Sequence, residues 1–321
     1  MVEKTSKNFF QLLGLGLKNY GKGIKFLINH KLYWFAVFPL ILFLGVYFVG
    51  IYFLNLEKGI GEDIALQSAE IDSLNGIIWL TTKMIFFDAL YMVFTKFTLY
   101  IVVILLSPLI AMLSEKIEEI LTGNKYPFNL KQLINDVKRG IKIAARNLFW
   151  EYLFLVIILG IASFFGGFVK NILIFSIPLV IGFYFYGFAF IDYINERRRL
   201  NIQQSIHFVS KHRGMAIAIG SVYYICFLSF HGVYRKFDSL AIDTTTQLIW
   251  GTVLLITFIC AALAPILAIT SATLSMHEVV DLSKNEFAIK TEKPDQSSIE
   301  EEEEEASEES PDTDENDNLN E

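Results

Sequence analysis

The sequence is poor in charge and nearly without cysteine. Charged side chains make up 19% of its 321 residues, whereas soluble domains carry about a quarter. The hydrophobic share is 53%, with 29 phenylalanines, which excludes a chain that is disordered throughout. Two cysteines are too few for a disulfide scaffold or a four-thiolate zinc site. This composition is typical of a membrane protein.

Signatures of enzymes are also missing. The chain has no His-Glu-x-x-His, no Gly-x-Ser-x-Gly and no phosphate-binding loop, the motifs that hold a catalytic metal, a nucleophile or a nucleotide. Its five histidines show no metal-ligand spacing. We therefore expect no enzymatic activity, no cofactor, no metal and no nucleic-acid partner.

The charge is distributed unevenly along the chain. Residues 292–321 hold 15 Asp and Glu and one Lys, a net of −14, which leaves residues 1–291 at +7. Such a segment buries too little apolar area to fold. We expect a disordered, cytoplasmic acidic tail over 292–321, which either solvates the protein or binds a basic partner.

Uncharged runs approach the roughly 20 residues that a membrane-crossing helix needs. The first run is too long for a signal peptide, and no cleavage site follows it. Two runs stand alone and the other four form two close pairs, so the sequence predicts two long transmembrane helices and two helical hairpins. The runs are 32–56, 97–114, 152–169, 171–191, 214–234 and 244–276.

Lysine and arginine between the runs set the orientation, because basic loops stay in the cytoplasm. Residues 57–83 carry five acids and two lysines, which places them outside. Each hairpin then begins and ends inside, whether it spans the bilayer fully or enters half-way. The basic segments are 1–31 with six lysines, 115–151 with seven Lys and Arg, and 192–213 with five.

Two amphipathic helices are expected at the membrane surface. Residues 9–30, within an N-terminal cytoplasmic segment 1–31, place lysines opposite an apolar face. That helix either lies on the anionic inner leaflet or packs on the cytoplasmic face of the protein. A second helix from Asn129 leads into the run at 152 and shows a basic and an apolar face. Its apolar face has Leu130, Ile134, Val137, Ile141, Ala145 and Leu148, with Lys138, Arg139, Lys142 and Arg146 largely away from it.

Residues 107–123 carry the most specific motif. They read SPLIAMLSEKIEEILTG, a proline with an apolar pair, a Leu-x-Glu-x-Ile-Glu core and a closing Leu-Thr-Gly. This motif resembles the signature of the CysZ/etoposide-induced membrane protein family. The likeness extends over residues 8–280, the body being 32–291, with Pro39, Pro108, Glu115 and Gly123 as motif positions. Weaker matches follow in the same order: Leu32 to Pro39, Asp192–Tyr193, Ala264–Pro265 and Ser271 to Thr273.

The resemblance implies an all-α, polytopic helical membrane protein, with two long crossing helices and hemi-penetrating hairpins, assembled as a homo-oligomer. Bacterial members are sulfate permeases, which implies transport of a small inorganic anion across a bacterial inner membrane. Eukaryotic relatives have no defined substrate, so a non-transporting scaffold that acts through its cytoplasmic helices and acidic tail is the alternative.

The resemblance also implies where sulfate is contacted. The permeases carry two adjacent arginines at the start of the first span, where this chain has Tyr33 and Trp34. Neither side chain has the charged fork with which arginine binds oxyanions, so we expect weak sulfate binding and an interfacial aromatic pair. The remaining ionisable candidates for anion binding, pairing or gating are Lys31, Lys96, Glu115 and Lys170.

The orientation is testable by cysteine labelling. Single cysteines placed between residues 57 and 83 of a cysteine-free variant should react with an impermeant maleimide added to intact cells, because the acidic loop faces outside. Cysteines in 115–151, 192–213 and the tail should react only after lysis. Labelling of the tail in intact cells would contradict this topology.

Overall fold

The computed structural model describes residues 7–68, 74–126, 130–238, 244–284 and 289–290, and these are almost entirely α-helical. The expected all-α polytopic fold is confirmed, the only strand pairing in these ranges being two residues long. The elements are α1 Phe9–Asn29, η1 Leu32–Ala36, α2 Val37–Ser68, α3 Leu74–Leu105, α4 Ser107–Thr122, β1 Asn124–Lys125, α5 Leu130–Ala162, α6 Gly167–Arg197, α7 Ile202–Lys211, α8 Arg213–Asp238, α9 Thr244–Val279, η2 Leu282–Lys284 and β2 Ile289–Lys290.

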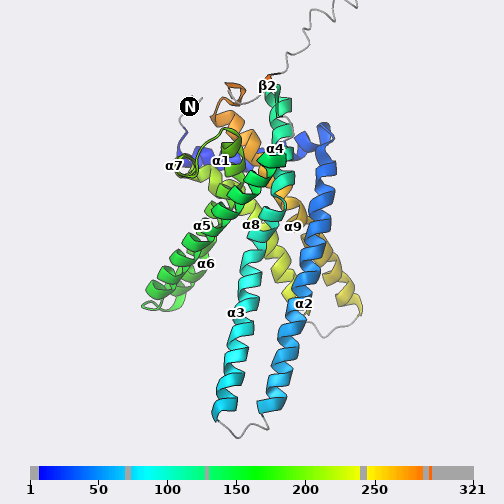
Figure 1. Cartoon of the computed structure of the whole chain (residues 1–321), viewed down its shortest axis with the longest axis vertical. Helices are drawn as coiled ribbons and strands as arrows, with labels where there is room; N and C mark the ends of the chain where they lie inside the picture. The colour runs from blue at the N-terminus through cyan, green and yellow to red at the C-terminus, as the bar shows by residue number, and fades with distance from the viewer. Residues whose placement is uncertain (1–6, 69–73, 127–129, 239–243, 285–288, 291–321) are drawn as a thin grey trace, which may run out of the picture.

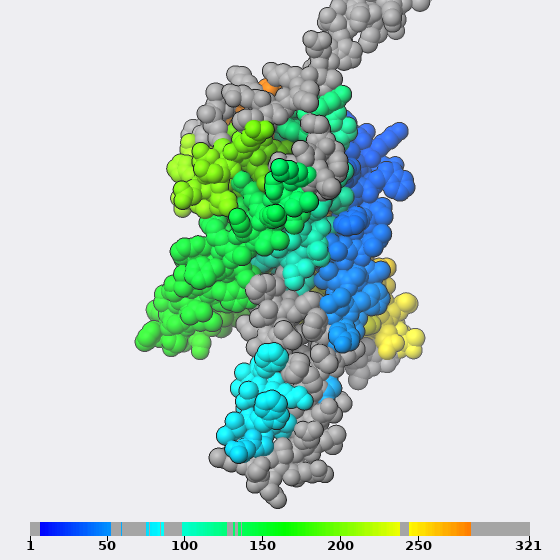
Figure 2. All heavy atoms as spheres, in the orientation of Figure 1, coloured from blue at the N-terminus to red at the C-terminus, as the bar shows by residue number. Residues whose placement is uncertain are grey.

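The helices gather at one end of the molecule and spread toward the other (Figure 1). Helices α1, α4 and α7 lie at the end where the helices gather, which we call the wide end because most of the elements meet there. Helices α2 and α3 run side by side to the opposite tip. The hairpins α5–α6 and α8–α9 stop well short of that tip. Figure 2 shows α5–α6 standing out from the body as an arm, and the arm's exposed side chains include Phe149, Val156, Phe164, Phe168 and Phe175. Such a surface suits lipid contact.

Five described helical segments are long and apolar enough to cross a membrane. They correspond to five of the six runs that the sequence predicts, including all four hairpin arms. Tyr47 of α2 and Tyr234 of α8 meet edge to face with centroids 5.7 Å apart, so the end of α8 lies beside the second half of the apolar segment Leu32–Tyr52. This position favours hairpins that reach the outer half of the bilayer. The segments are Leu32–Tyr52, Val137–Ala162, Gly167–Arg197, Arg213–Phe237 and Thr244–Val279.

The run over 97–114 forms a broken span or a re-entrant loop and not one straight helix. Thr98–Leu105 and Ser107–Thr122 meet at a bend of 57°, and Pro108 lies in the first turn of α4. Proline is well placed there, since its fixed φ suits a helix start and its missing N–H is not needed. The second long helix, α3, instead extends back to Leu74.

Helix α4 also ends as its motif requires. Gly123 adopts φ 76°, and its N–H donates to the Glu119 carbonyl at 2.8 Å. A left-handed cap of this kind favours glycine because a Cβ would be strained there. Two residues of chain then pair with β2, Asn124 opposite Lys290. The tail, 292–321, and Asn129 lie outside the described residues.

Helix α1 presents three different faces. One face is buried against α8 and α9, where Asn19 Nδ2 donates to Ser275 Oγ at 3.0 Å and the Ser271 hydroxyl to the Gly16 carbonyl at 2.9 Å. A second face stays apolar and open, with Phe10 77% and Ile28 61% exposed. The third carries lysines. The helix thus packs on the protein, which is the second of the two arrangements that the sequence left open, and keeps one apolar face exposed.

The closest approach between helices is that of α6 and α8. A Cβ on Gly187 would lie 1.8 Å from the Ala216 carbonyl oxygen, and one on Gly220 1.8 Å from the Phe183 carbonyl oxygen. The two backbones are therefore in contact, with each glycine facing the other helix. Small residues serve this purpose in membrane helices because lipid supplies no hydrophobic force between them.

Substitution should reveal how much the fold depends on this contact. Gly187→Ala should lower the thermal stability of the purified protein in detergent, by roughly 1–3 kcal/mol or more, because backbone must move to admit a methyl group. Gly232→Ala is the matched control in α8, since nothing lies within 4 Å of its added Cβ. Equal melting temperatures for the two variants would show that the close contact of α6 and α8 contributes nothing measurable to the stability of the fold.

Candidate functional site

A buried polar stripe runs along one face of α4. Ser107, Ser114 and Glu118 are each 0% exposed, and their spacing of seven and four residues places them on the same side of the helix. The stripe extends for about 16 Å at 1.5 Å per residue. Apolar side chains such as Ile110 and Ile117 are buried beside it. Ala111 lies between Ser107 and Ser114 on this face, so the stripe consists of separate polar groups inside an apolar body.

Glu118 is the acidic centre of the stripe. Its carboxylate accepts from Arg197 Nη2 at 3.1 Å and from Asn124 Nδ2 at 3.4 Å. The Tyr126 hydroxyl donates to the same carboxylate. The buried charge is thereby matched by a buried cation and two neutral donors, which offsets the cost of removing it from water.

Arg197 connects the stripe to α6 and α9. Besides Glu118, its Nη2 donates to Ser114 Oγ at 2.8 Å, and Ser114 in turn shares a 2.8 Å hydrogen bond with Thr273 of α9. The guanidinium side chain is only 7% exposed. Its Nε and Nη1 nevertheless have no acceptor among the described residues. Two buried nitrogens of this cation, which carry three N–H groups, therefore lack an acceptor among the described residues.

Arg198 adds a second positive charge beside this site. Its guanidinium lies 5.8 Å from the centre of the Phe208 ring, and within the described part of the chain its Nη1 has no acceptor. Burial lowers the pKa of Arg198 from its ordinary value, and the Glu118 carboxylate acts against that shift. The group Arg197, Arg198 and Glu118 thus carries a net positive charge in a desolvated place.

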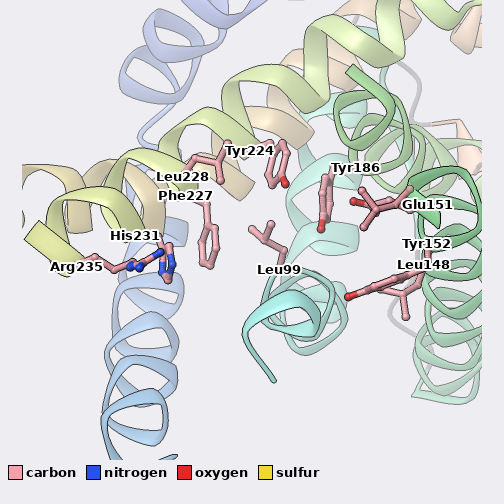
Figure 3. A pocket seen from close by; sticks show the side chains of 11 residues that line it. Leu99, Leu148, Glu151, Tyr152, Tyr186, Tyr224, Phe227, Leu228, His231 and Arg235 are labelled. Carbon is pink, nitrogen blue, oxygen red and sulfur yellow. The ribbon is translucent and has the colours of Figure 1, made fainter. Parts of the chain in front are cut away.

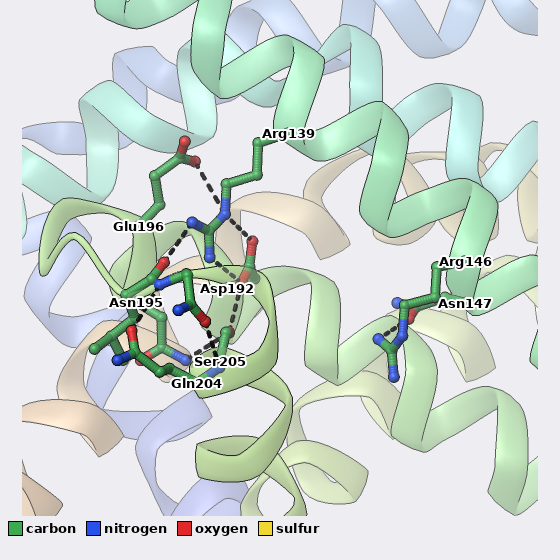
Figure 4. A network of polar contacts seen from close by, with 10 residues as sticks. Arg139, Arg146, Asn147, Asp192, Asn195, Glu196, Gln204 and Ser205 are labelled. Carbon is green, nitrogen blue, oxygen red and sulfur yellow. Dashed lines mark hydrogen bonds and ion pairs between the residues drawn. The ribbon is translucent and has the colours of Figure 1, made fainter.

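A separate ion pair joins α5 to α6 (Figure 4). Arg139 donates to both carboxylate oxygens of Asp192, from Nε at 2.9 Å and from Nη2 at 2.8 Å, and also to the Leu200 carbonyl at 2.5 Å. The Ser205 hydroxyl donates to Asp192 Oδ1, the oxygen that also accepts from Arg139 Nη2, at 2.5 Å. This pair is saturated by bidentate geometry, so it serves to hold helices together.

The apolar face of the helix at 129–150 points outward. Arg139 and Asn147 turn inward, Asn147 being 0% exposed and donating to the Phe185 carbonyl at 3.2 Å, whereas Ile134 and Ile141 are each 48% exposed. An outward apolar face is favourable in a membrane protein because lipid accepts apolar side chains. Interior positions then go to polar groups that find partners on α6.

The ionisable candidates from the sequence do not come together. Lys31 precedes η1 with φ 56° and is exposed at the wide end, and Lys170 is exposed in the first turn of α6, at the hairpin tip. Glu115 is half-buried on α4, one turn before Glu118. Lys96 belongs to α3, and its side chain lies outside the described residues.

The residues that replace the arginine pair are at the surface. Tyr33 is 49% and Trp34 70% exposed, with ring centroids 5.8 Å apart. Neighbouring exposed aromatics of this kind are typical of the membrane–water interface. The motif residue Pro39 is buried at the start of α2.

Sequence reasoning overlooked three of the residues described above. Glu118 stands in the same motif as Glu115, and a burial estimate by helical spacing from Ser114 would have selected it. Arg197 and Arg139 carry no such signal, since basic residues beside spans usually mark topology. Their partners are 79 and 53 residues away in the chain.

Comparison with known proteins gives one family. The family model described as sulfate transporter CysZ/etoposide-induced protein 2.4 matches residues 19–230. Among curated proteins, none matches the chain significantly. The matched range includes α4, α5, α6 and most of α8, and thus both ion pairs.

The bidentate ion pair of Arg139 and Asp192 should contribute strongly to the stability of the fold. Asp192→Asn would remove the nearer counter-charge of Arg139, which is 15% exposed, and leave only Glu196 at 4.0 Å, so we expect a loss of about 3 kcal/mol in detergent-unfolding experiments. Glu119→Gln is the control, since the Lys116–Glu119 pair has side chains 50% and 27% exposed and should contribute less than about 1 kcal/mol. Similar losses in both variants would refute a special role for the buried pair.

Proposed function

Because the chain belongs to the sulfate transporter CysZ/etoposide-induced protein 2.4 family, we propose that it conducts a small inorganic anion across the membrane. The proposal includes a bacterial cytoplasmic membrane, with both termini in the cytoplasm, and assembly as a homo-oligomer. The observation that carries it is Arg197, a buried cation that keeps two nitrogen donors without an acceptor among the described residues.

An anion at this position would meet suitable chemistry. Arginine donors bind oxyanions through charge-assisted hydrogen bonds, and such bonds strengthen away from water. The net positive charge of Arg197, Arg198 and Glu118 would be balanced by one anionic ligand. The hydroxyl of Ser114 lies beside Arg197, and that of Ser107 lies about 10 Å further along α4, so both add polar groups on the same buried face.

Glu118 would keep the site from binding an anion too tightly to release it. Conduction requires that an ion bind well enough to enter and weakly enough to leave. A carboxylate 3.1 Å from Arg197 lowers the attraction for a second anion, because part of the arginine's charge is already matched. The absence of arginine at 33 and 34 weakens capture at the surface as well. Both features support slow or weak sulfate handling.

Flux into proteoliposomes tests the proposal. The full chain should take up labelled sulfate or chloride faster than protein-free vesicles do. Arg198→Gln should slow the flux about tenfold, since one charge-assisted interaction is lost. Arg199→Gln is the matched control, because Arg199 is the exposed neighbour in the chain.

The double change Tyr33→Arg and Trp34→Arg should raise sulfate binding.

The outcome separates transport from its alternative. If Arg198→Gln and Arg199→Gln change the flux equally, the site at Arg197 and Arg198 is not part of the conduction pathway. Absence of any anion flux, in both the wild type and the double arginine variant, would overturn the proposal. The family membership would then favour a membrane scaffold that recruits partners through its cytoplasmic helices and acidic tail.

A further inference from the structure

The acidic group of the pocket between the two hairpins is matched inside the body. In this pocket, where α3, α5, α6 and α8 meet (Figure 3), Glu151 accepts a hydrogen bond from the Tyr100 hydroxyl at 2.7 Å. Glu151 lies in the apolar segment Val137–Ala162 of α5, and the beginning of the same helix carries charge of the opposite sign at the surface. Three lysines are exposed there: Lys131, Lys138 and Lys142.

These three lysines form a row along one face of α5, which we call the lysine row. Their spacing of seven and four residues places them within about 40° of one another around the helix, and the row extends for about 16 Å. Within the described part of the chain, neither Lys138 nor Lys142 makes a salt bridge. Arg139, on another side of the same helix, is paired with Asp192. The row is therefore positive charge that the described body leaves without a counter-charge.

The acidic tail, 292–321, begins within reach of this row. Strand β2 pairs antiparallel with β1, so that Lys290 lies opposite Asn124, and only residues 126–129 separate β1 from α5. Asn124 and Lys131 are seven residues apart, which is at most about 25 Å of extended chain. The strand pairing thus fixes the start of the tail near the beginning of α5.

The length and the charge of the tail both fit the row. Ten to fifteen residues separate Lys290 from the six glutamates at 300–305, which is up to about 35–50 Å of extended chain. The far end of the row is at most about 45 Å from Lys290 by the same measure, so these glutamates can reach every lysine of the row. The tail carries −14 and residues 1–291 carry +7. A tethered segment with the opposite charge is present at an effective concentration in the millimolar range.

We propose that the acidic tail docks on the lysine row of α5, with carboxylates of Glu300–Glu305 as the counter-charges of Lys138 and Lys142. The anionic inner leaflet is the competing surface for these lysines. That leaflet repels a segment of net charge −14, so the tail has a lower free energy near the membrane when cations of the protein match its charge. The docking is independent of anion conduction, because the row does not include Arg197 or Arg198.

Zero-length cross-linking of the purified full chain in a neutral detergent tests the docking. A carbodiimide joins a lysine amine to a carboxylate where the two are in contact, and mass spectrometry identifies the joined peptides. We expect cross-links between the row and residues 300–305 at low ionic strength. Their yield should fall about tenfold in 1 M salt, where the Debye length is about 3 Å. Lys18 and Lys25, exposed on α1, are the reference lysines and should give little of this product.

A spin label on the tail gives a second readout. A nitroxide on Ser307→Cys, in a full chain without other cysteines, should show an immobilised component when the tail is docked. The double change Lys138→Gln and Lys142→Gln should lower the ratio of docked to free tail by up to about tenfold, because exposed ion pairs contribute modestly. Lys18→Gln with Lys25→Gln is the matched control, since it removes the same charge from another exposed surface, and it should leave the spectrum unchanged.

Each outcome supports or overturns the docking. Cross-links to the row, together with a loss of the immobilised component in the Lys138 and Lys142 variant alone, support it. Equal effects of the two double variants would show general attraction between charges and overturn it, as would the absence of cross-links at low salt. Nanodiscs separate the tail from the leaflet. Cross-links that persist in phosphatidylglycerol support the tail, and cross-links that occur in phosphatidylcholine but vanish in phosphatidylglycerol would show that lipid occupies the row, which overturns the proposal.

Discussion

Contact between the backbones of α6 and α8 holds the two hairpins in one body. Helices surrounded by lipid gain little from hiding apolar side chains, so close approach and paired polar groups must supply the attraction. Gly187 and Gly220 permit that approach. Because α8 in turn packs on α1 and α9 and α6 on α5, the position of nearly every other helix at the wide end follows from this crossing.

The buried charges follow from the same solvent. Inside the body Arg139 meets Asp192 and Arg197 meets Glu118, since an unpaired ion away from water would cost several kcal/mol. The pairs differ in how completely they are satisfied. Arg139 uses its fork on both oxygens of one carboxylate, whereas Arg197 retains unused donors. The first pair is therefore structural, and the second has capacity left for a ligand.

Hydropathy was sufficient for the class of fold and for most of the spans, because the thickness of the bilayer acts on each segment separately. The motif at 107–123 also indicated the family. The bend at Leu106 and the inward turn of Arg139 depend on contacts between segments that are distant in the chain, and these leave no local pattern. The glycines of α1 illustrate the same limit. As an isolated helix α1 is weakened by them, yet Gly16 and Gly23 are the residues that face α8 and α9.

The three faces of α1 also have a mechanical consequence. Its buried face is fixed to α8 and α9, and Lys22 on its basic face reaches Glu278 of α9 at 2.7 Å. On a third side Phe10 and Ile28 are exposed, and the transfer of such side chains from an apolar environment into water costs free energy. Because the buried face of this one helix contacts both arms of the second hairpin, a rotation of α1 would have to move α8 and α9 together.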